Sequence, residues 1–233
     1  CMEFTTKINI PKASFSITHQ DKLLLLGSCF TENIGNYLNQ NQFQTNSNPF
    51  GIIYNPISIF GNLDNIIHHK IYQENDLLLH NELYLSLDHH GQFSGTDKTE
   101  VLSTINSKIT QSNSDFKSAK FIIITLGTAF VYTHLEQNKM VANCHKIPNN
   151  AFEKRLLSIE EIKSSFNVIK DDLKDKIVLF TVSPVRHWRD GAIENQRSKS
   201  ILIESIHLLI AENKNCFYFP AYELMMDELR DYR

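Results

Sequence analysis

The chain has 233 residues, a formal net charge of −3 and 42% hydrophobic residues. At roughly 150 residues per domain, this length favours one large domain or two small ones with an ordinary apolar core. The near-neutral charge argues against a nucleic-acid or anionic-membrane partner, and no apolar run of about 18 residues is present to form a membrane span.

Four cysteines are present, and their spacing predicts neither a zinc site nor a disulfide framework. Cys29 and Cys216 border apolar runs, where a thiol usually acts as a small core residue. No secretory signal precedes the first apolar run, so we expect a cytoplasmic protein. We interpret Met2 as the natural start and Cys1 as an added residue. The alternative is a mature lipoprotein that begins at Cys1.

Continuous apolar runs at 23–26, 121–126 and 177–182 predict strands that are buried on both faces, as in a parallel sheet. A shorter run at 216–219 predicts a fourth strand. An alternating segment at 42–46 predicts a strand at the sheet edge.

Helical spacing of apolar residues predicts the connections between these strands, with Asn55 and Ser158 as N-terminal caps. The expected helices span 31–40, 56–68, 99–111, 158–173 and 198–213. Alternating strands and helices are typical of an α/β fold with a mostly parallel sheet.

One segment interrupts the alternation. Residues 77–93 predict a β-hairpin with alternating leucines and a turn at 88–91. We therefore expect one domain over 1–233 with a hairpin insertion at about 77–97.

Small or polar residues follow every predicted strand. Ligands bind beyond the carboxyl ends of strands in open α/β sheets, so these residues are the first candidates for a site. Gly27-Ser28 is the sharpest case, because a serine between a strand and a helix points its hydroxyl toward this edge. The simpler interpretation is a turn with a helix cap.

Several motifs in order resemble the GSCFA family of the SGNH/GDSL-hydrolase superfamily. Residues 27–35 read GSCFTENIG and residues 48–56 read NPFGIIYNP. Further similar stretches are 85–90, 125–132, 141–148, 183–199 and 218–233. The resemblance implies a flavodoxin-like three-layer α/β/α sandwich.

The resemblance also implies a serine hydrolase with Ser28 as its nucleophile. The backbone N–H groups of Ser28 and Gly51 would then donate hydrogen bonds to the oxyanion. The superfamily's third block carries an Asn donor that residues 127–130, GTAF, lack. The hydroxyl of Thr128 is our candidate substitute. Loss of one oxyanion donor typically costs about 100- to 1,000-fold in rate.

A serine nucleophile needs a histidine base, and the superfamily supplies it from an Asp-x-x-His motif near the C-terminus. No such motif follows Tyr218. We expect the chain to be truncated before this pair, with the base beyond residue 233.

Within the chain, His187 is the best candidate for a base. Arg186 and Arg189 flank it and are expected to lower its pKa, so we assign His187 and Arg186 to substrate contact, with an arginine binding a carboxylate or phosphate. The alternative is an exposed loop histidine beside a packed Trp188.

His89, in the predicted turn, and His145, in a stretch that carries the resemblance, are further candidates for substrate contact. Adjacent histidines such as His89-His90 point apart in a strand and lack carboxylate partners, so we expect no metal site and no cofactor.

These observations predict an esterase that removes acyl groups such as acetyl from a small-molecule or carbohydrate ester. We expect neither nucleic acid nor membrane as a partner, and the oligomeric state stays open. The rival hypothesis is a catalytically inactive carbohydrate- or metabolite-binding module. A nucleotide-binding flavodoxin-like protein is disfavoured, because no Gly-rich phosphate loop follows a strand.

Overall fold

The computed structural model describes residues 6–230. The interpretation of Cys1 and Met2 therefore lies outside the described residues. Within residues 6–230, no helix combines the length and the apolar character that crossing a bilayer requires.

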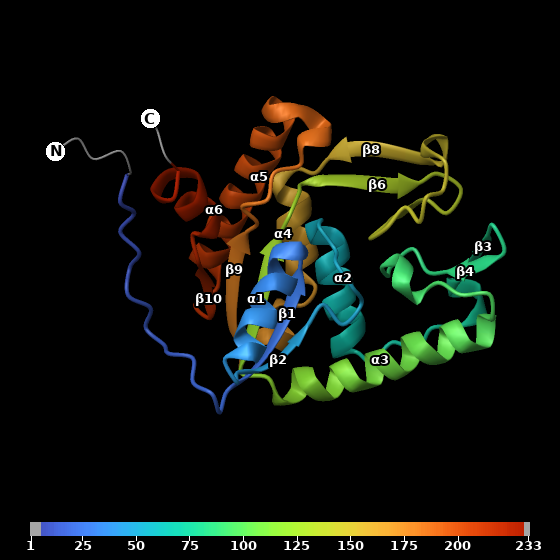
Figure 1. Cartoon of the computed structure of the whole chain (residues 1–233), viewed down its shortest axis with the longest axis horizontal. Helices are drawn as coiled ribbons and strands as arrows, with labels where there is room; N and C mark the ends of the chain where they lie inside the picture. The colour runs from blue at the N-terminus through green and yellow to red at the C-terminus, as the bar shows by residue number, and fades with distance from the viewer. Residues whose placement is uncertain (1–5, 231–233) are drawn as a thin grey trace.

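A parallel five-stranded sheet forms the centre of the fold (Figure 1). Its order across the sheet is β2-β1-β5-β9-β10, which is 2-1-3-4-5 when the parallel strands are numbered along the chain. This is the flavodoxin-like order, and it confirms the predicted α/β sandwich. The strands span Lys22–Gly27 (β1), Gln44–Ser47 (β2), Phe121–Leu126 (β5), Ile177–Val182 (β9) and Cys216–Tyr218 (β10).

The central strands are buried on both faces because successive side chains enter different layers. In β1, Leu24 and Leu26 belong to the larger core, whereas Leu23 and Leu25 belong to a smaller core on the opposite face. This two-sided burial explains why the sequence shows continuous apolar runs and no alternation.

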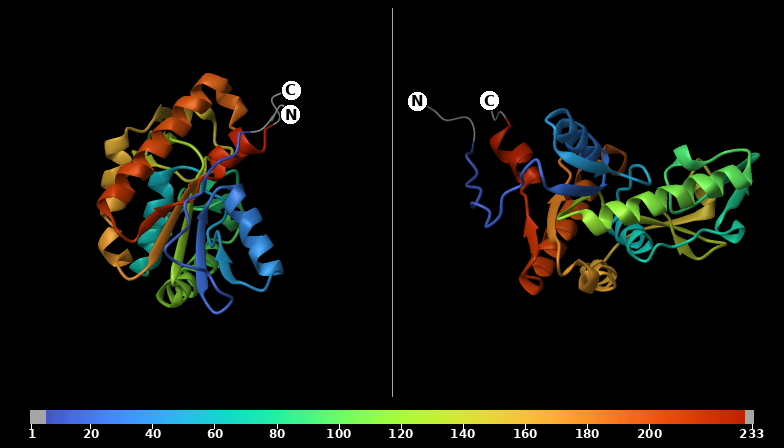
Figure 2. Two further views of the ribbon diagram at one scale, coloured as in Figure 1. Left: turned by 90° about the vertical axis from the view of Figure 1, so that its left-hand side faces the viewer. Right: turned by 90° about the horizontal axis from the view of Figure 1, so that it is seen from below.

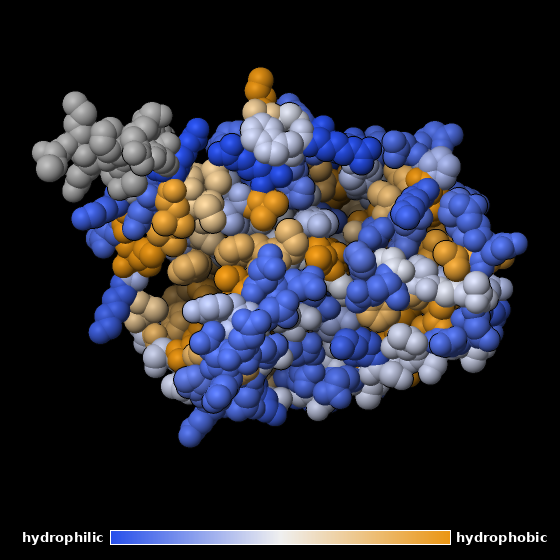
Figure 3. Space-filling view, viewed as in Figure 1, coloured by the Kyte–Doolittle hydropathy of each residue, from blue (hydrophilic) through white to orange (hydrophobic). Residues whose placement is uncertain are grey.

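Helices cover the two faces unequally (Figure 2). On one face the larger core joins α2, α3, α4 and α5 to the sheet. On the other face, α1 and the segment before β1 pack on the sheet, with the Phe15 ring 4.8 Å from that of Phe217. Figure 3 shows apolar surface beside this segment. The helices span Cys29–Gln40 (α1), Pro56–Ile67 (α2), Lys98–Ser118 (α3), Ile159–Asn167 (α4), Gly191–Glu212 (α5) and Ala221–Glu223 (α6).

Three predicted helices differ in extent from the observed ones. The helix expected over 99–111 continues to Ser118, and the one expected from residue 198 begins at Gly191. The helix expected over 158–173 ends at Asn167 and is followed by a short 3-10 helix, Lys170–Leu173. Both extensions carry polar residues, for which apolar periodicity gives no signal.

The predicted hairpin exists, but its predicted turn at 88–91 is wrong. Strands Leu78–His80 (β3) and Leu83–Leu85 (β4) pair through a two-residue turn at Asn81 and Glu82. Both turn residues have a left-handed φ, +49° and +63°, as a tight hairpin turn requires. Residues 86–93 instead form a loop that packs inward.

A second antiparallel sheet was not predicted. Strands Phe130–His134 (β6), Lys139–Met140 (β7) and Phe152–Leu156 (β8) pair in the order β7-β6-β8. Val141 beside β7 and the inner residues Leu85 and Leu87 share a small apolar cluster. The hairpin region and this sheet therefore support each other beyond the carboxyl edge of the central sheet.

Gly27 permits the turn from β1 into α1. Its φ is +143°, and a Cβ placed there would lie 2.2 Å from the carbonyl oxygen of Thr125 in the adjacent strand β5. Both features exclude a side chain, because the contact is with backbone and the conformation disfavours L residues.

Gly27→Ala is expected to lower the free energy of unfolding by about 2–4 kcal/mol, because it adds left-handed strain and forces two strands apart. Chemical denaturation measures the change. Gly61→Ala is the matched control, since Gly61 lies inside α2 with no atom within 4 Å of its added Cβ. The control should gain about 0.5–1 kcal/mol. Equal effects of the two substitutions would contradict this role of Gly27.

Candidate functional site at the carboxyl edge of the sheet

Ser28 is placed by the end of β1 and the beginning of α1. It is the N-cap of α1, and its Oγ accepts a hydrogen bond from the Phe30 N–H at 3.3 Å. The residue is 1% exposed. The two interpretations of Ser28 from the sequence, a helix cap and a hydroxyl at the sheet edge, are therefore compatible. A capping serine also lies at the positive end of the helix dipole.

The loop from Asn48 to Asn55 is hydrogen-bonded to the ends of β1 and β5. These two strands lie on either side of the point where the strand order reverses. The Ile53 N–H donates to the Gly27 carbonyl at 3.0 Å, and the Gly127 N–H donates to the Tyr54 carbonyl at 2.8 Å. Gly27 ends β1 and Gly127 follows β5. The loop thus crosses the crevice in which flavodoxin-like folds bind ligands.

Asn48 holds this loop against the Ser28 turn. Its buried side-chain Oδ1 accepts a hydrogen bond from the Gly27 N–H at 2.9 Å, and its Nδ2 lies 3.5 Å from the Ser28 carbonyl oxygen. Its backbone has a left-handed φ of +46°, which asparagine tolerates better than most residues. Asn48 begins the NPFGIIYNP stretch at residues 48–56, whose sequence alone does not indicate this role.

The proposed oxyanion donors are close to Asn48, and both are bonded inside the protein. The Gly51 N–H donates to the Asn48 carbonyl at 2.8 Å, and the Ser28 N–H donates to the Thr125 carbonyl at 3.3 Å. Each N–H would have to exchange its present acceptor for a substrate oxygen.

Thr128, the proposed substitute donor, also has internal partners. Its Oγ1 lies 3.1 Å from the Ser198 Oγ and accepts from the Phe130 N–H at 3.1 Å. Its role as an oxyanion donor stays a prediction.

Lys199 is a buried cation that sequence analysis missed. Its side chain is fully buried, and Nζ donates to the carbonyls of Gly127 and Ser183, each at 2.7 Å. These carbonyls follow β5 and β9, so Lys199 ties together the carboxyl ends of two neighbouring strands. Burial lowers the pKa of Lys199 to about 8. The sequence feature that could have revealed the burial of Lys199 is its position on the face of α5 that otherwise carries small and apolar residues.

His187 lies at the same edge, with its ring 5.3 Å from the Tyr54 ring. Its Nε2 is buried and has no hydrogen-bond partner among the described residues. Burial is the main cause that lowers the pKa of His187, and Lys199 is the next. The pKa is therefore lowered as expected, but by burial and Lys199 and not by the flanking arginines.

The predicted packing of Trp188 is wrong, because this side chain is 61% exposed. The Arg186 guanidinium lies 5.4 Å from the Trp188 ring and 3.1 Å from the Met226 Sδ. Arg186 and His187 thus neighbour each other in sequence but have separate surroundings.

His89 and His145 belong to the inward-packing loop and its support. His89 has no exposed surface, its Nδ1 lies 2.8 Å from the Ser86 Oγ, and burial lowers its pKa to about 4. The His145 Nε2 lies 2.7 Å from the Ser86 carbonyl oxygen. The adjacent His90 N–H donates to the Phe50 carbonyl at 3.0 Å. These contacts brace the loop that carries Gly51, and substrate contact by either histidine stays a prediction.

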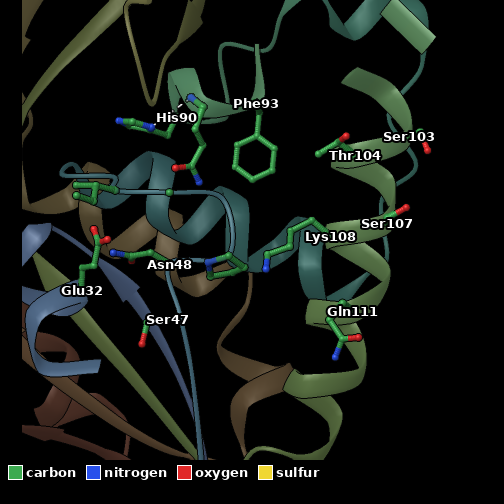
Figure 4. A pocket seen from close by; sticks show the side chains of 14 residues that line it. Glu32, Ser47, Asn48, His90, Phe93, Ser103, Thr104, Ser107, Lys108 and Gln111 are labelled. Atoms are coloured by element: carbon green, nitrogen blue, oxygen red, sulfur yellow. Dashed lines mark hydrogen bonds between the residues drawn. The ribbon is translucent and has the colours of Figure 1, made fainter. Parts of the chain in front are cut away.

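A cavity of about 1090 Å³ opens beside Asn48 and Gly51 (Figure 4). The Asn48–Ile52 segment and Glu32 of α1 form one side, α3 forms the facing side, and His90 and Phe93 close a third side. Across residues 6–230, no group of three or more His, Cys, Asp or Glu side chains is arranged to hold a metal ion.

The fold and this edge define an α/β protein of flavodoxin-like topology with a serine at the first strand-to-helix turn. The family model described as the GSCFA family matches residues 22–233. The chain therefore belongs to the GSCFA family. A search of curated proteins and a search of solved structures each gave no match.

Replacing Asn48 should test the tie to Gly27. Asn48→Gly is expected to cost about 1–3 kcal/mol of unfolding free energy, because the buried Gly27 N–H loses its acceptor. Asn48→Ala should cost about 1 kcal/mol more, because alanine is strained at a left-handed φ. Urea denaturation of both variants gives the comparison. A stability equal to that of the natural chain in both would show that the tie contributes nothing.

The buried Lys199 predicts a specific pH dependence. Its folded-state pKa of about 8 lies below the ordinary value of 10.5, so the unfolded chain binds more protons between these values and stability rises with pH there. Relative to Lys199→Met, the natural chain should gain about 2 kcal/mol between pH 7.5 and 9.5. The measurement is urea denaturation of both proteins at each pH. A constant difference between them would contradict a lowered pKa.

Proposed function

We propose that this GSCFA protein is an ester hydrolase of the SGNH type with Ser28 as its nucleophile. The observation that carries the proposal is the position of Ser28. It lies at the N-terminus of a twelve-residue helix, after the first strand of a flavodoxin-like sheet and beside the strand-order reversal. The GSCFTENIG stretch at residues 27–35, which carries the resemblance to the family, contains this serine.

In the proposed reaction, the Ser28 Oγ bonds to the acyl carbon while a base takes the hydroxyl proton. The carbonyl oxygen becomes an oxyanion held by the N–H groups of Ser28 and Gly51, and the alcohol then leaves with that proton. Water hydrolyses the acyl-serine in the second half. Because both N–H groups have internal acceptors at 3.3 and 2.8 Å, substrate binding must include a small shift of the Ser28 turn and another of the Asn48–Gly51 turn.

The proposed reaction needs a base for the Ser28 hydroxyl proton. Among residues 6–230, no histidine is hydrogen-bonded to the Ser28 Oγ. His187 is the candidate at this edge, because its lowered pKa keeps it neutral near pH 7 and able to accept a proton. The family resemblance instead implies a histidine from an Asp-x-x-His motif. Experiments should therefore use the protein as its gene encodes it.

A fluorophosphonate probe tests the nucleophile. We expect one probe mass on the natural protein, mapped to the peptide with Ser28, because an activated serine oxygen displaces fluoride from phosphorus. Ser28→Ala should lose the label. Ser28→Asn should also lose it while keeping a helix cap, which separates loss of the nucleophile from loss of about 1 kcal/mol of capping.

Ser114→Ala is the matched control, since Ser114 is an exposed serine on α3 that does not line the cavity beside Gly51, and its labelling should be unchanged. Labelling that persists in both Ser28 variants, or no labelling of the natural protein, would refute the assignment.

A non-catalytic binding module is the second candidate. The observation that favours it is that each proposed oxyanion donor, including the Thr128 hydroxyl, already has an internal partner. A binding module should resist fluorophosphonate and still bind a polar ligand at the same edge.

A further inference from the structure

A separate cavity of about 400 Å³ lies where three segments meet. They are the loop that follows β9, the first turns of α5, and the helical segment that follows β10 and contains α6 (Figure 1). Arg186 and Trp188 line it from the loop, and Tyr222 and Met226 line it from the helical segment. Ser28 does not line it. We call this space the Arg186 cavity.

Arg186 is a half-buried cation without a carboxylate partner. Its Nη2 donates to the Met226 Sδ at 3.1 Å, and no carboxylate among residues 6–230 lies within ion-pair distance of its guanidinium. A thioether sulfur is a weak acceptor, whereas a guanidinium carries five N–H donors. Most of the hydrogen-bonding capacity of Arg186 is therefore left for water or a ligand.

Aromatic and thioether groups lie beside this cation. The Trp188 ring is 5.4 Å from the Arg186 guanidinium, and the Trp188 side chain is 61% exposed. The Tyr222 ring is buried, and its hydroxyl donates to the Gln196 Oε1 at 2.9 Å. An exposed tryptophan next to an arginine without a carboxylate partner is the combination that is enriched where proteins bind their partners.

The charges around the cavity favour an anion. Asp227 and Arg230 also line it, and their opposite charges lie three positions apart on one exposed segment, so they largely offset each other. The charge of Arg186 remains. Ala192, in the first turn of α5, brings the positive end of a 22-residue helix to the same space.

The shape of the guanidinium narrows the choice of anion. Its planar fork of N–H donors matches the two oxygens of a carboxylate, whereas a phosphate dianion carries more charge than one arginine balances. The faces of Trp188 and the Met226 thioether both make favourable contacts with an aromatic ring. A volume of about 400 Å³ lies at the lower end of the range for small-molecule sites, which runs from about 300 to 1,000 Å³.

We infer that the Arg186 cavity binds a small aromatic carboxylate. The carboxylate lies on the Arg186 guanidinium, and the ring lies against Trp188 and Met226. This site goes beyond the proposed hydrolase function, because it uses neither Ser28 nor a base. The sequence predicted that an arginine here binds a carboxylate or phosphate, and the inference gives Arg186 a carboxylate in a cavity of its own.

Trp188 provides the measurement, because it is the only tryptophan among the 233 residues. Its fluorescence is followed during titration with benzoate, 3-phenylpropanoate and 4-phenylbutanoate, which place the ring at different distances from the carboxylate. At least one of these acids should give a saturable change. Its carboxamide should bind about 10-fold more weakly or worse, because the hydrogen bonds from Arg186 are no longer assisted by charge on the acceptor.

Arg186→Gln should weaken the affinity for that acid about 10-fold or more, and Arg186→Lys about 3- to 10-fold, because lysine keeps the charge but loses the planar fork. The lysine variant guards against a loss of packing in the glutamine variant. Arg189→Gln is the matched control, since Arg189 is exposed in the same loop and does not line the cavity. It should bind the acid as the natural protein does.

The inference is overturned if no acid gives a saturable change, if the carboxamide binds as tightly as the acid, or if Arg186→Gln keeps the natural affinity. Tighter binding of inorganic phosphate than of every carboxylate would also overturn it. The hydrolase proposal is tested separately. Acid binding without fluorophosphonate labelling would keep the Arg186 site and refute the nucleophile, and labelling of Ser28 without acid binding would do the reverse.

Discussion

The close approach of two backbones, at Gly27 of β1 and the Thr125 carbonyl of β5, is the constraint on which the rest of the site depends. No side chain fits between them, since an added Cβ would lie 2.2 Å from that oxygen. The chain therefore leaves β1 in a backbone conformation that favours glycine. Helix α1 begins directly afterwards, with Ser28 as its cap. The same close approach places Ser28 beside the strand-order reversal, where the loop after β2 closes over both strands.

Buried polar groups keep this edge in place. Asn48 satisfies the Gly27 N–H, and Lys199 satisfies two strand-end carbonyls, so the edge is held by side chains where the sheet's own hydrogen bonds end. Burying an unpaired lysine costs free energy, and the two short bonds to carbonyls offset part of that cost. The inward-packing loop supports the arrangement from outside through His90 and Phe50. We regard the edge as a preorganised frame whose adjustable parts are the Ser28 turn and the Asn48–Gly51 turn.

Continuous apolar runs predicted four strands of the parallel sheet, because they report burial on both faces, and an alternating segment predicted the edge strand β2. The three-layer sandwich was implied by the family resemblance. The apolar runs placed Ser28 for the same reason, since the serine follows such a run directly. Sequence patterns failed where burial was partial or where chain segments meet only in space. The strands β6 to β8 are short and half exposed, and the turn at Asn81-Glu82 lacks the usual glycine. Lysine is rarely buried, so Lys199 was passed over. The cavity beside Gly51 joins segments more than fifty residues apart, and no local pattern reveals it.

The most direct test of the account is a crystal structure of the gene-encoded protein after reaction with a fluorophosphonate. The account predicts phosphorus bonded to the Ser28 Oγ and a phosphoryl oxygen about 3 Å from the backbone nitrogens of Ser28 and Gly51. Those two N–H groups would then have left the Thr125 and Asn48 carbonyls. A phosphonyl group on another residue, or a phosphoryl oxygen bonded to neither nitrogen, would contradict the claim that this strand-to-helix turn is a catalytic site.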